Sequence, residues 1–303
     1  EHMNCAIIGS TKIAEVHAKH LIKNGVKEIT FISRSISKRK KIIANVSKQI
    51  SQKVEFFQSD IKILKKRFFN IICICSSTEV HDKHLKVVSG LKSIIIIEKP
   101  IISLLKFQKR YDIFLKNLYK KNKKIVVCYP YLFLAKSFKK FFTNIKKINN
   151  IDFEFQTGGK AKFEKICVNL IPHALSFFHV FLKRNFLKRN IKKGTTLIKR
   201  NLWKVDFNSN KTIINLIFKV NYKKKTSLKV AINNLIFVRK SLKKKGKLIN
   251  YIQNYKTNKR KNINNPIGEF YKDFFKNLNR LKYYQTNRNI TFDIMKKNYF
   301  FLN

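Results

Sequence analysis

Short apolar runs alternate with amphipathic stretches along the first part of the chain. The run from Asn4 to Gly9 ends in glycine, and apolar residues then recur every three or four positions from Ile13 to Leu21. A continuous apolar run is consistent with a strand buried on both faces, whereas the three-to-four spacing is typical of a helix with one buried face. The pattern predicts a strand, a tight turn and a helix.

The same alternation continues to residue 130. Helices are predicted over residues 37–50 and through Leu85 and Val88. Six strands that alternate with helices specify a doubly wound parallel sheet, whose ligands bind beyond the carboxyl ends of the strands. We therefore expect residues 3–130 to form a Rossmann dinucleotide-binding domain. Its further strands are predicted at 28–33, 54–58, 69–75, 93–98 and 125–129.

The pattern changes after Tyr129. Three segments approach a period of two without regular helices between them, as antiparallel strands do. Apolar helices are predicted at 168–182 and 269–281. Because 303 residues are many for one hydrophobic core, residues 131–303 are expected to form a second, α+β domain with a largely antiparallel sheet. The three period-two segments are 151–156, 212–220 and 227–238.

The net charge of +51 arises from 67 Lys and Arg against 16 Asp and Glu. Such a charge fits a polyanionic partner, because cations that neutralise phosphates release counterions. A nucleic-acid-binding protein usually gathers its charge on one face or tail, whereas lysines here recur from Lys12 to Lys297 beside many Asn, Ile and Phe. These residues have A/T-rich codons, so we interpret the charge as a compositional bias and predict no specific nucleic-acid partner. Any such surface still attracts anions.

The cysteines and the apolar runs indicate a cellular compartment. The five cysteines are an odd number without a CxxC pair, which predicts reduced thiols in the cytoplasm. The longest apolar runs, such as Ile94–Ile97, are far shorter than the ~20 residues of a transmembrane helix. We therefore predict no membrane partner, and no residue pattern predicts a metal site.

The first strand-to-helix turn resembles a phosphate-binding turn. Its sequence, Gly-Ser-Thr-Lys-Ile-Ala over residues 9–14, is a variant of GxGxxG/A in which Thr11 replaces the second glycine. Gly9 permits the tight turn, and the helix that begins near Lys12 and Ile13 offers backbone N–H groups to a pyrophosphate. An ordinary turn with one glycine explains the same residues.

The end of the second strand lacks the carboxylate that usually accepts from the ribose of NAD. It carries Ser33, Arg34 and Ser35, and Lys38 follows in the next helix. Hydroxyls and a guanidinium suit a 2′-phosphate, because Arg offers a planar fork of donors. NADP(H) is therefore the preferred cofactor and NAD(H) the alternative, although the general basic bias also explains Arg34.

Glu98, Lys99 and Pro100 follow the fifth strand, at the edge where ligands bind in such sheets. The proline disfavours a helical conformation of Lys99, so its ammonium can be held toward a substrate oxygen or the nicotinamide ribose. A lysine in a surface turn is the plain alternative.

These motifs resemble, in order, those of the glucose-fructose oxidoreductase, inositol dehydrogenase and rhizopine catabolism (Gfo/Idh/MocA) family. Residues 9–21 are similar to its opening turn and helix, 76–81 to its fourth-strand loop ending in His81, and 98–100 to its signature triplet. Residues 169–176 lie where the family carries a helix with Asp, then His four residues later, then often Asp after three more. Asn265-Pro266 and the aromatic residues that follow look like its late helix, so the resemblance spans nearly the whole chain.

The resemblance implies a Rossmann domain followed by an open-faced sheet through which dimers commonly form. It also implies hydride transfer at an alcohol or carbonyl carbon of a sugar or cyclitol. Lys99 would orient and polarise the reacting oxygen and His173 would be its general acid/base, which suits an ammonium and an imidazole. Asn169 and Tyr129 are candidate substrate residues. The candidate cofactor residues are Gly9, Thr11, Lys12, Ile13, Ser33, Arg34, Ser35, Lys38, Ser76, Ser77, His81, Glu98 and Lys99.

The chain departs from the family pattern at three places. Asn169 and Ser176 replace the usual acids, so the pKa of His173 should be less elevated and reduction of a carbonyl or imine is favoured over oxidation of a polyol. Aromatic residues at 129–133 replace a polar loop. The predicted substrate is a small, sugar-derived carbonyl compound, with a nucleotide-linked sugar as one form.

Two other functions compete with the enzyme. A non-catalytic NADP sensor would bind the dinucleotide and contact a protein, and the lost acids favour it, but it has no reason to keep both Lys99 and His173. A nucleic-acid-binding protein would need a clustered basic face with interleaved aromatics. His173 itself could be a structural histidine beneath an apolar helix face, and the order of the motifs favours the catalytic interpretation.

Overall fold

The computed structural model describes residues 2–141, 147–182, 186–188, 190–221, 226–244 and 247–303. Its chain divides into two compact units. The first contains Glu1–Tyr129 and Ile267–Phe292, and the second contains Pro130–Pro266 and Asp293–Asn303. The polypeptide therefore returns to the first unit after most of the second is complete.

The first unit is built on a six-stranded sheet in the order β3-β2-β1-β4-β5-β6, and every pair of neighbours is parallel. β1 and β4 lie at the centre, and their continuous apolar runs are covered on both faces. This order is that of a Rossmann fold and confirms the predicted doubly wound sheet. The strands are β1 (Asn4–Ile8), β2 (Glu28–Ile32), β3 (Glu55–Ser59), β4 (Ile71–Ile74), β5 (Ile94–Glu98) and β6 (Ile125–Cys128).

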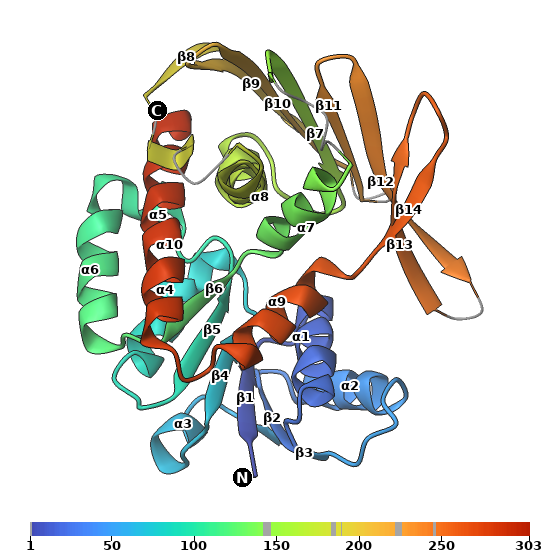
Figure 1. Ribbon diagram of the computed structural model, residues 1–303. Helices are drawn as coiled ribbons and strands as arrows, with labels where there is room; N and C mark the ends of the chain where they lie inside the picture. The colour runs from blue at the N-terminus through green and yellow to red at the C-terminus, as the bar shows by residue number, and fades with distance from the viewer. Residues whose placement is uncertain (1, 142–146, 183–185, 189, 222–225, 245–246) are drawn as a thin grey trace. The chain divides into compact units, whose positions relative to one another are not determined.

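Helices cover both faces of this sheet, with α1 and α2 on one face and α4 and α6 on the other (Figure 1). α1 buries one stripe of Ala14, His17, Ala18, Leu21 and Ile22 against the sheet, as its spacing predicts. The helices are α1 (Lys12–Lys23), α2 (Ile36–Ser47), α3 (Ile63–Lys66), α4 (His81–Val88), α5 (Leu104–Phe107) and α6 (Tyr111–Lys121), with short 3₁₀ turns at Thr78–Val80 and Gln108–Arg110.

The late helices α9 (Pro266–Lys276) and α10 (Leu281–Leu302) also contribute to the first unit. β6 lies at the edge of the sheet, where its outer backbone groups need partners. The buried side chain of Asn287 supplies both: its Oδ1 accepts from the Val127 N–H at 2.9 Å, and its Nδ2 donates to the Val127 carbonyl at 3.0 Å. A single amide thus takes the place of a neighbouring strand at this position.

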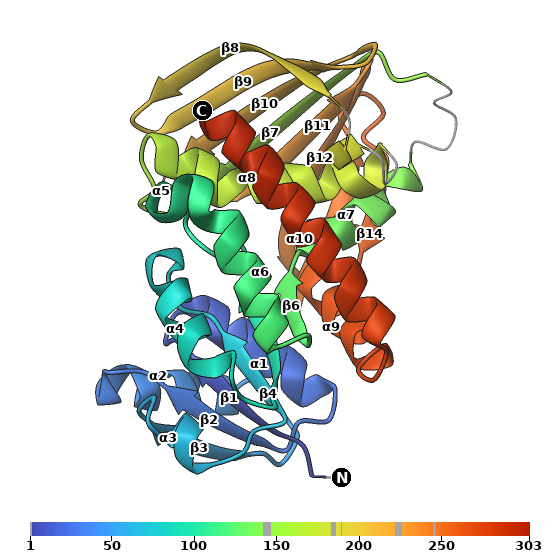
Figure 2. The same cartoon turned by 90° about the vertical axis from the view of Figure 1, so that its left-hand side faces the viewer.

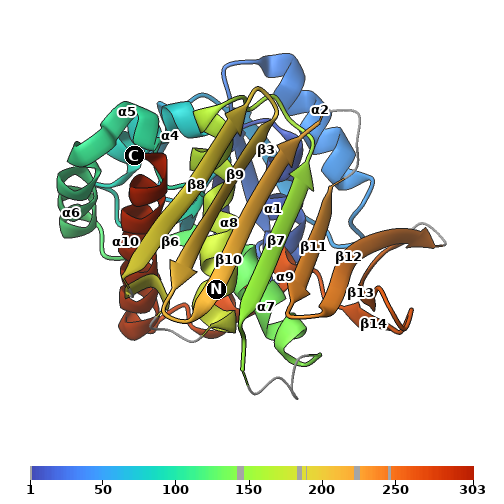
Figure 3. The same cartoon turned by 90° about the horizontal axis from the view of Figure 1, so that it is seen from above.

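The second unit contains an eight-stranded sheet in the order β14-β13-β12-β11-β7-β10-β9-β8, shown from above in Figure 3. β7 and β10 are parallel and all other neighbours are antiparallel, which confirms the predicted largely antiparallel sheet. The strands are β7 (Asn150–Thr157), β8 (Ile191–Lys199), β9 (Leu202–Ser209), β10 (Thr212–Val220), β11 (Ser227–Ile232), β12 (Leu235–Lys244), β13 (Lys247–Asn254) and β14 (Arg260–Ile263).

Two expectations for the second unit are wrong. Residues 227–238 are a hairpin of β11 and β12 instead of one strand. Its two-residue turn begins at Asn233, whose φ of 51° suits a tight hairpin, and the Asn-Asn pair is the signal that could have revealed it. The aromatic segment after Tyr129 is the start of helix α7 (Pro130–Lys139), because proline is favoured in a first helical turn.

Helix α8 (Glu164–Phe181) lies across one face of the eight-stranded sheet (Figure 2). Aromatic side chains fill the space between them. The ring of Phe153 on β7 is 5.4 Å from that of Phe177 and 5.6 Å from that of Phe178, and 6.2 Å from that of Phe218 on β10. This aromatic cluster is the core of the second unit.

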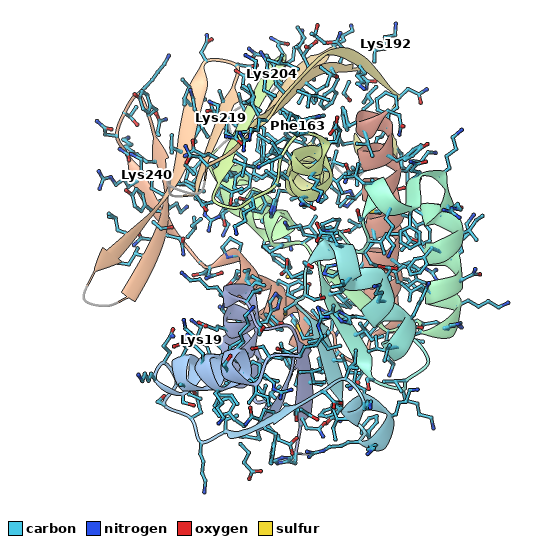
Figure 4. All side chains as sticks on the ribbon, turned by 180° about the vertical axis from the view of Figure 1, so that it is seen from behind. Lys19, Phe163, Lys192, Lys204, Lys219 and Lys240 are labelled. Atoms are coloured by element: carbon cyan, nitrogen blue, oxygen red, sulfur yellow. The ribbon has the colours of Figure 1, made fainter. Side chains whose placement is uncertain are left out.

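The opposite face of the sheet is polar. Here Asn215 donates to Asp152 at 2.6 Å, and Lys219 pairs with Glu154 at 2.5 Å. A hollow of about 290 Å³ on this face is lined by Asp152, Glu154, Asn215 and Lys204, among others. Figure 4 labels lysines from α1, β8, β9, β10 and β12, so the positive charge is spread over many elements. In the part of the chain that the structure describes, no helix is long and apolar enough to cross a membrane.

Candidate functional site

The turn after β1 brings the chain very close to the end of β4. Gly9 has a φ of +131°, and a Cβ built on it would lie 2.8 Å from the carbonyl carbon and oxygen of Cys75. Glycine is therefore required here by both conformation and space. Thr11 is the N-cap residue of α1, and Thr11 and Lys12 are exposed while Ile13 is half-buried. The free N–H groups of this helix end can receive an anion.

The end of β2 is held by a buried arginine. Arg39 donates to the carbonyl of Ser33 at 2.6 Å and also to that of Ser59, so its guanidinium fixes the loop. Ser35 is the N-cap of α2 and its hydroxyl accepts from the Lys38 N–H at 3.3 Å. Arg34 is exposed at the end of the strand. The guanidinium that could meet a ligand here is thus that of Arg34.

A hollow of about 280 Å³ lies between the starts of α1 and α2. It brings together Lys12 from the first predicted motif and Lys38 from the second, which are 26 positions apart in the sequence. A pair of ammonium groups beside a helix N-terminus suits a phosphate. The complete lining is Ser10, Lys12, Glu15, Lys38, Lys41 and Ile42.

The end of β5 is tied to α1 through a buried ion pair. His17 is 0% exposed, and its Nε2 lies 2.6 Å from the Oε1 of Glu98. Burial alone would lower the pKa of His17, but neighbouring Cys73 and Glu98 raise it to about 10. Burial would raise the pKa of Glu98, but the hydrogen bond and charge of His17 lower it. The two groups therefore form an imidazolium–carboxylate pair.

His81 connects the loops that follow β4 and β5. It is 1% exposed, and its Nδ1 lies 2.9 Å from the Pro100 carbonyl while its Nε2 lies 2.9 Å from the Ser76 carbonyl. Burial lowers the pKa of His81, which favours the neutral ring, and the single N–H of that ring donates to one of the two carbonyls. Ser76 Oγ lies 2.8 Å from the Nδ1 of His84, and Ser77 is exposed. The pKa of Lys99 in this loop is lowered by burial, and the negative charge of Glu98 offsets part of that effect.

Tyr271 of α9 completes this region and was not predicted. Its Oη lies 2.6 Å from the Nδ1 of His17, and its ring stacks on that of His20 at 5.8 Å. The sequence around it is a run of aromatic residues at helical spacing, which predicts core packing. Nothing in that pattern distinguishes Tyr271 from Phe270 or Phe274.

Among the residues that the structure describes, two groups of side chains have the ligand atoms and spacing of a metal site: His17 with Cys73 and Cys75, and His17 with Glu98 and Cys128. Both groups depend on His17. Its two ring nitrogens already contact Tyr271 and Glu98. We therefore assign this cluster to the protein's own hydrogen bonds.

In the second unit, α8 exposes few polar groups. From Ile166 to Phe178 every residue is buried except Asn169 and His173, which lie one turn apart on the same face. The His173 ring packs beside Tyr131, with centroids 4.3 Å apart, and beside Phe155 at 5.1 Å. The sequence-predicted substrate residue and acid/base thus share one aromatic-lined helix face.

Pro172 interrupts the hydrogen bonds of α8 directly before His173. A proline has no N–H to donate to the carbonyl four residues earlier, which here is that of Val168. The buried Asn298 of α10 replaces the missing donor, because its Nδ2 donates to the Val168 carbonyl at 3.1 Å. The helix therefore tolerates a proline at the turn that carries the candidate residues.

The other predicted residues are placed as follows. Tyr129 is 2% exposed and lies in the first unit, and burial raises its pKa. Ser176, at the position of the usual second acid, is 1% exposed and donates to the His173 carbonyl of its own helix. Lys99 belongs to the first unit and His173 to the second. Their action at one reaction centre stays a prediction.

The six-stranded parallel sheet, its glycine turn and its helix N-terminus define a dinucleotide-binding protein of the Rossmann class. Residues 3–129 match the family described as "Oxidoreductase family, NAD-binding Rossmann fold", which is the Gfo/Idh/MocA family. This match places that part of the chain in an oxidoreductase family and confirms the resemblance predicted from the motifs.

Solved structures with a similar fold cover nearly the whole chain. A dehydrogenase (MviM) from Clostridium difficile has a TM-score of 0.67 at 13% identity, over 98% of this chain and 100% of that one. KijD10, a 3-ketoreductase from Actinomadura kijaniata in complex with NADP and TDP-benzene, has a TM-score of 0.69 at 8% identity, over 96% and 95%. A Gfo/Idh/MocA family oxidoreductase from Vibrio cholerae has a TM-score of 0.61 at 12% identity, over 95% and 94%. A comparison with curated proteins finds no match.

Proposed function

We propose that this protein is an NADP(H)-dependent oxidoreductase that transfers hydride between the cofactor and a carbonyl or alcohol carbon of a small, sugar-derived substrate. The observation that carries the proposal is the grouping at one edge of the Rossmann sheet. There the glycine turn after β1, the basic hollow between α1 and α2, and Lys99 after β5 all lie at carboxyl ends of strands. Ligands of doubly wound sheets bind at this edge.

The residues at this edge fit a phosphorylated dinucleotide. Gly9 has no Cβ where one would meet the β4 backbone, so the chain can bend tightly before the N-terminus of α1. Gly9, Thr11, Lys12 and Ile13 would hold the pyrophosphate at that helix end. The nicotinamide ring supplies or accepts the hydride. The 2′-phosphate would be held by Ser33, Arg34, Ser35 and Lys38, and the residues nearer the nicotinamide would be Ser76, Ser77, His81 and Glu98.

Lys99 and His173 would act on the reacting oxygen of the substrate. When hydride is added to a carbonyl carbon, negative charge develops on its oxygen, and an ammonium beside that oxygen stabilises it. His173 would donate the proton that completes the alcohol, because imidazole can exchange protons near neutral pH. The aromatic rings of Tyr131 and Phe155 limit the positions that the His173 ring can adopt. Asn169, one turn away, would bind a substrate hydroxyl or carbonyl.

The substrate class is proposed from two observations. The rings beside His173 offer an apolar surface in place of acids, which favours a carbonyl compound over a polyol. KijD10, which shares the fold, is a 3-ketoreductase that binds NADP and TDP-benzene. A nucleotide-linked sugar ketone also suits a strongly basic surface, since its diphosphate is attracted by lysines.

The proposal is tested with thermal-shift titrations of NAD, NADP and their reduced forms, followed by turnover assays against carbonyl and polyol panels. We expect NADPH to stabilise the protein most and to be oxidised by a ketone-containing sugar or nucleotide sugar. If none of the four dinucleotides raises the melting temperature, the proposal is wrong. Binding without any turnover would instead support a sensor, and efficient polyol oxidation with negligible reduction would contradict the reductive direction.

Replacement of His173 separates binding from chemistry. The change His173→Ala should leave NADPH affinity within about twofold while lowering kcat by roughly 10²–10⁴, the usual contribution of a general acid. His179→Ala, on the same helix, is the control. Full turnover of His173→Ala would show that its ring is structural.

A further inference from the structure

The two residues that flank Lys99 are each in contact with a buried histidine. Before Lys99, the Glu98 carboxylate accepts from His17 Nε2 at 2.6 Å. After it, the Pro100 carbonyl lies 2.9 Å from His81 Nδ1. The two histidines come from different helices, α1 and α4, and both are almost completely buried. The short loop that carries Lys99 therefore lies between two histidine side chains that cannot reach solvent, and the contact with His17 is the charged one.

The contact before Lys99 extends further, to the late helix α9. Tyr271 Oη lies 2.6 Å from His17 Nδ1, so the ring of His17 is bonded at both nitrogens. The Tyr271 ring also stacks on His20, one turn along α1, and its Oη is 3.7 Å from Cys73 Sγ. Figure 1 shows α9 beside α1 within the first unit. A residue 172 positions after Lys99 thus contacts the group that holds its neighbour.

The carboxylate of Glu98 lies between two cationic groups, His17 and Lys99, and interacts with both. A buried carboxylate is costly unless it is paired and hydrogen-bonded, and here His17 satisfies that need for Glu98. In turn, the negative charge of Glu98 raises the pKa of Lys99 against the effect of burial. Displacement of the Glu98 carboxylate would therefore alter both the position and the charge of the ammonium.

We propose that Tyr271 and His17 form a positioning relay that holds the Glu98 carboxylate at the end of β5 and thereby sets the position of Lys99. The relay is Tyr271 Oη to His17 Nδ1, and His17 Nε2 to Glu98 Oε1. Tyr271, His17 and Glu98 act through Lys99 and are positioning residues. The inference rests on the proposed function, in which Lys99 acts on the reacting oxygen.

The first test removes one hydroxyl. Tyr271→Phe keeps the ring that stacks on His20 and deletes only the Oη, which contacts His17 and lies 3.7 Å from Cys73 Sγ. Tyr284→Phe is the matched control, because Tyr284 is buried in the same unit and its Oη donates to the Leu278 carbonyl at 2.6 Å, away from Glu98. We expect Tyr271→Phe to lower kcat about tenfold or more, with NADPH affinity unchanged, and Tyr284→Phe to leave kcat unchanged.

The second test measures the pH at which the Lys99 amine loses its proton, and it needs neither cofactor nor turnover. The protein is reductively methylated at a series of pH values, and the extent of labelling at Lys99 is read by peptide mass spectrometry. Glu98→Gln removes the charge that raises the pKa of Lys99, so half-maximal labelling should move to lower pH. Tyr271→Phe should shift it in the same direction by less, and Tyr284→Phe should not shift it.

Two replacements of His17 test whether its N–H donor to Glu98 is what the relay needs. Gln at position 17 can still donate an amide N–H toward Glu98, whereas Leu cannot. His17→Gln should therefore retain more turnover, and a Lys99 labelling curve closer to the original, than His17→Leu. Equal losses in the two variants would contradict the relay and indicate packing alone.

The possible failures are distinguishable. If no substrate is turned over, or if Lys99→Ala turns over substrate as fast as the original protein, the proposed function fails. The labelling curves of Lys99 in the other variants still decide whether the relay controls this residue. If Lys99→Ala abolishes turnover but Tyr271→Phe changes neither kcat nor Lys99 labelling, the relay is wrong and the proposed function stands.

Discussion

At the scale of single residues, the choice between NADP and NAD would depend on the side chains that follow β2. Arg34 is exposed there, whereas the nearby Arg39 is already bonded to the carbonyls of Ser33 and Ser59. The basic bias of the chain makes any one arginine ambiguous in the sequence. The structure separates these two because the buried one is committed to holding the loop.

Arg34→Ala should weaken NADPH binding selectively. Loss of a hydrogen-bonded charge beside a 2′-phosphate should cost roughly 1–3 kcal/mol, about 5- to 150-fold in Kd. NADH, which lacks that phosphate, should bind as before. Arg110→Ala, which removes an exposed arginine elsewhere in the first unit, is the control in the same fluorescence titrations. Equal weakening of NADPH and NADH by Arg34→Ala would refute the assignment.

Asn298 and Pro172 should be energetically coupled. Asn298→Leu leaves the buried Val168 carbonyl without its donor, which should lower the free energy of unfolding by about 1–3 kcal/mol. Pro172→Ala restores the N–H that can bond this carbonyl within α8, so the same Asn298→Leu change should cost less in that background. Urea unfolding of the four proteins in this cycle measures the coupling. Additive effects would show that Asn298 does not compensate for the proline.

At the scale of elements, the turn between β1 and α1 depends on a close contact with the end of β4. Gly9→Ala would place a Cβ 2.8 Å from the Cys75 backbone and would also strain a φ of +131°. The backbone strain alone costs about 1–3 kcal/mol. Gly25→Ala is the matched control, because Gly25 has a φ of +97° but nothing within 4 Å of the added Cβ.

Both glycine variants should be less stable, but only Gly9→Ala should lose NADPH affinity as well, because it moves the N-terminus of α1 relative to β4. Chemical denaturation and NADPH fluorescence measure the two effects. Retention of full affinity by Gly9→Ala would show that this turn does not bind the dinucleotide.

The sequence predicts elements well where burial and hydrophobicity coincide. In the first sheet, β4 and β5 consist almost entirely of isoleucine, so their pattern was sufficient. In α10 the buried residues recur at helical spacing, but three of them are polar: Asn287, Thr291 and Asn298. The hydrophobic pattern of the sequence therefore does not reveal this helix. β8 and β14 contain no buried residue, which is a related reason why they were not predicted. β9 was also not predicted, although Trp203, Val205 and Phe207 are buried at alternate positions along it.

In the candidate site, too, some residues could be predicted from the sequence and others could not. Gly9, Lys12 and Lys38 were predicted from local motifs, and the structure brings Lys12 and Lys38 to one hollow. The partners of Glu98 could not be predicted, because Tyr271 lies far away in the sequence and resembles its aromatic neighbours. Long-range polar contacts leave no periodic signal in a single chain. The predicted domains 3–130 and 131–303 stay predictions as functional units.

At the scale of the whole molecule, the net charge of +51 should make stability depend on ionic strength. Repulsion among many cations opposes the compact state, and salt shortens its range from about 30 Å at 0.01 M to about 10 Å at 0.1 M. Surface ion pairs such as Lys219–Glu154 weaken with salt, but they contribute little.

The melting temperature should therefore rise by several degrees when NaCl is added to a low-salt buffer. Calorimetry in NaCl and in sodium phosphate of equal ionic strength separates screening from binding of phosphate at the basic hollow. A melting temperature that falls with NaCl would show that ion pairs outweigh repulsion.

The return of the late helices to the first unit has a consequence for synthesis on the ribosome. β6 is complete once residue 129 has emerged, yet the Val127 backbone receives its partner only when Asn287 follows. At ordinary translation rates this interval is on the order of ten seconds. Throughout it the nascent sheet has an open edge, which is the kind of surface on which newly made chains aggregate. A fragment that ends near residue 130 would keep that edge permanently, so a stable isolated first unit needs residues 267–292 joined to it.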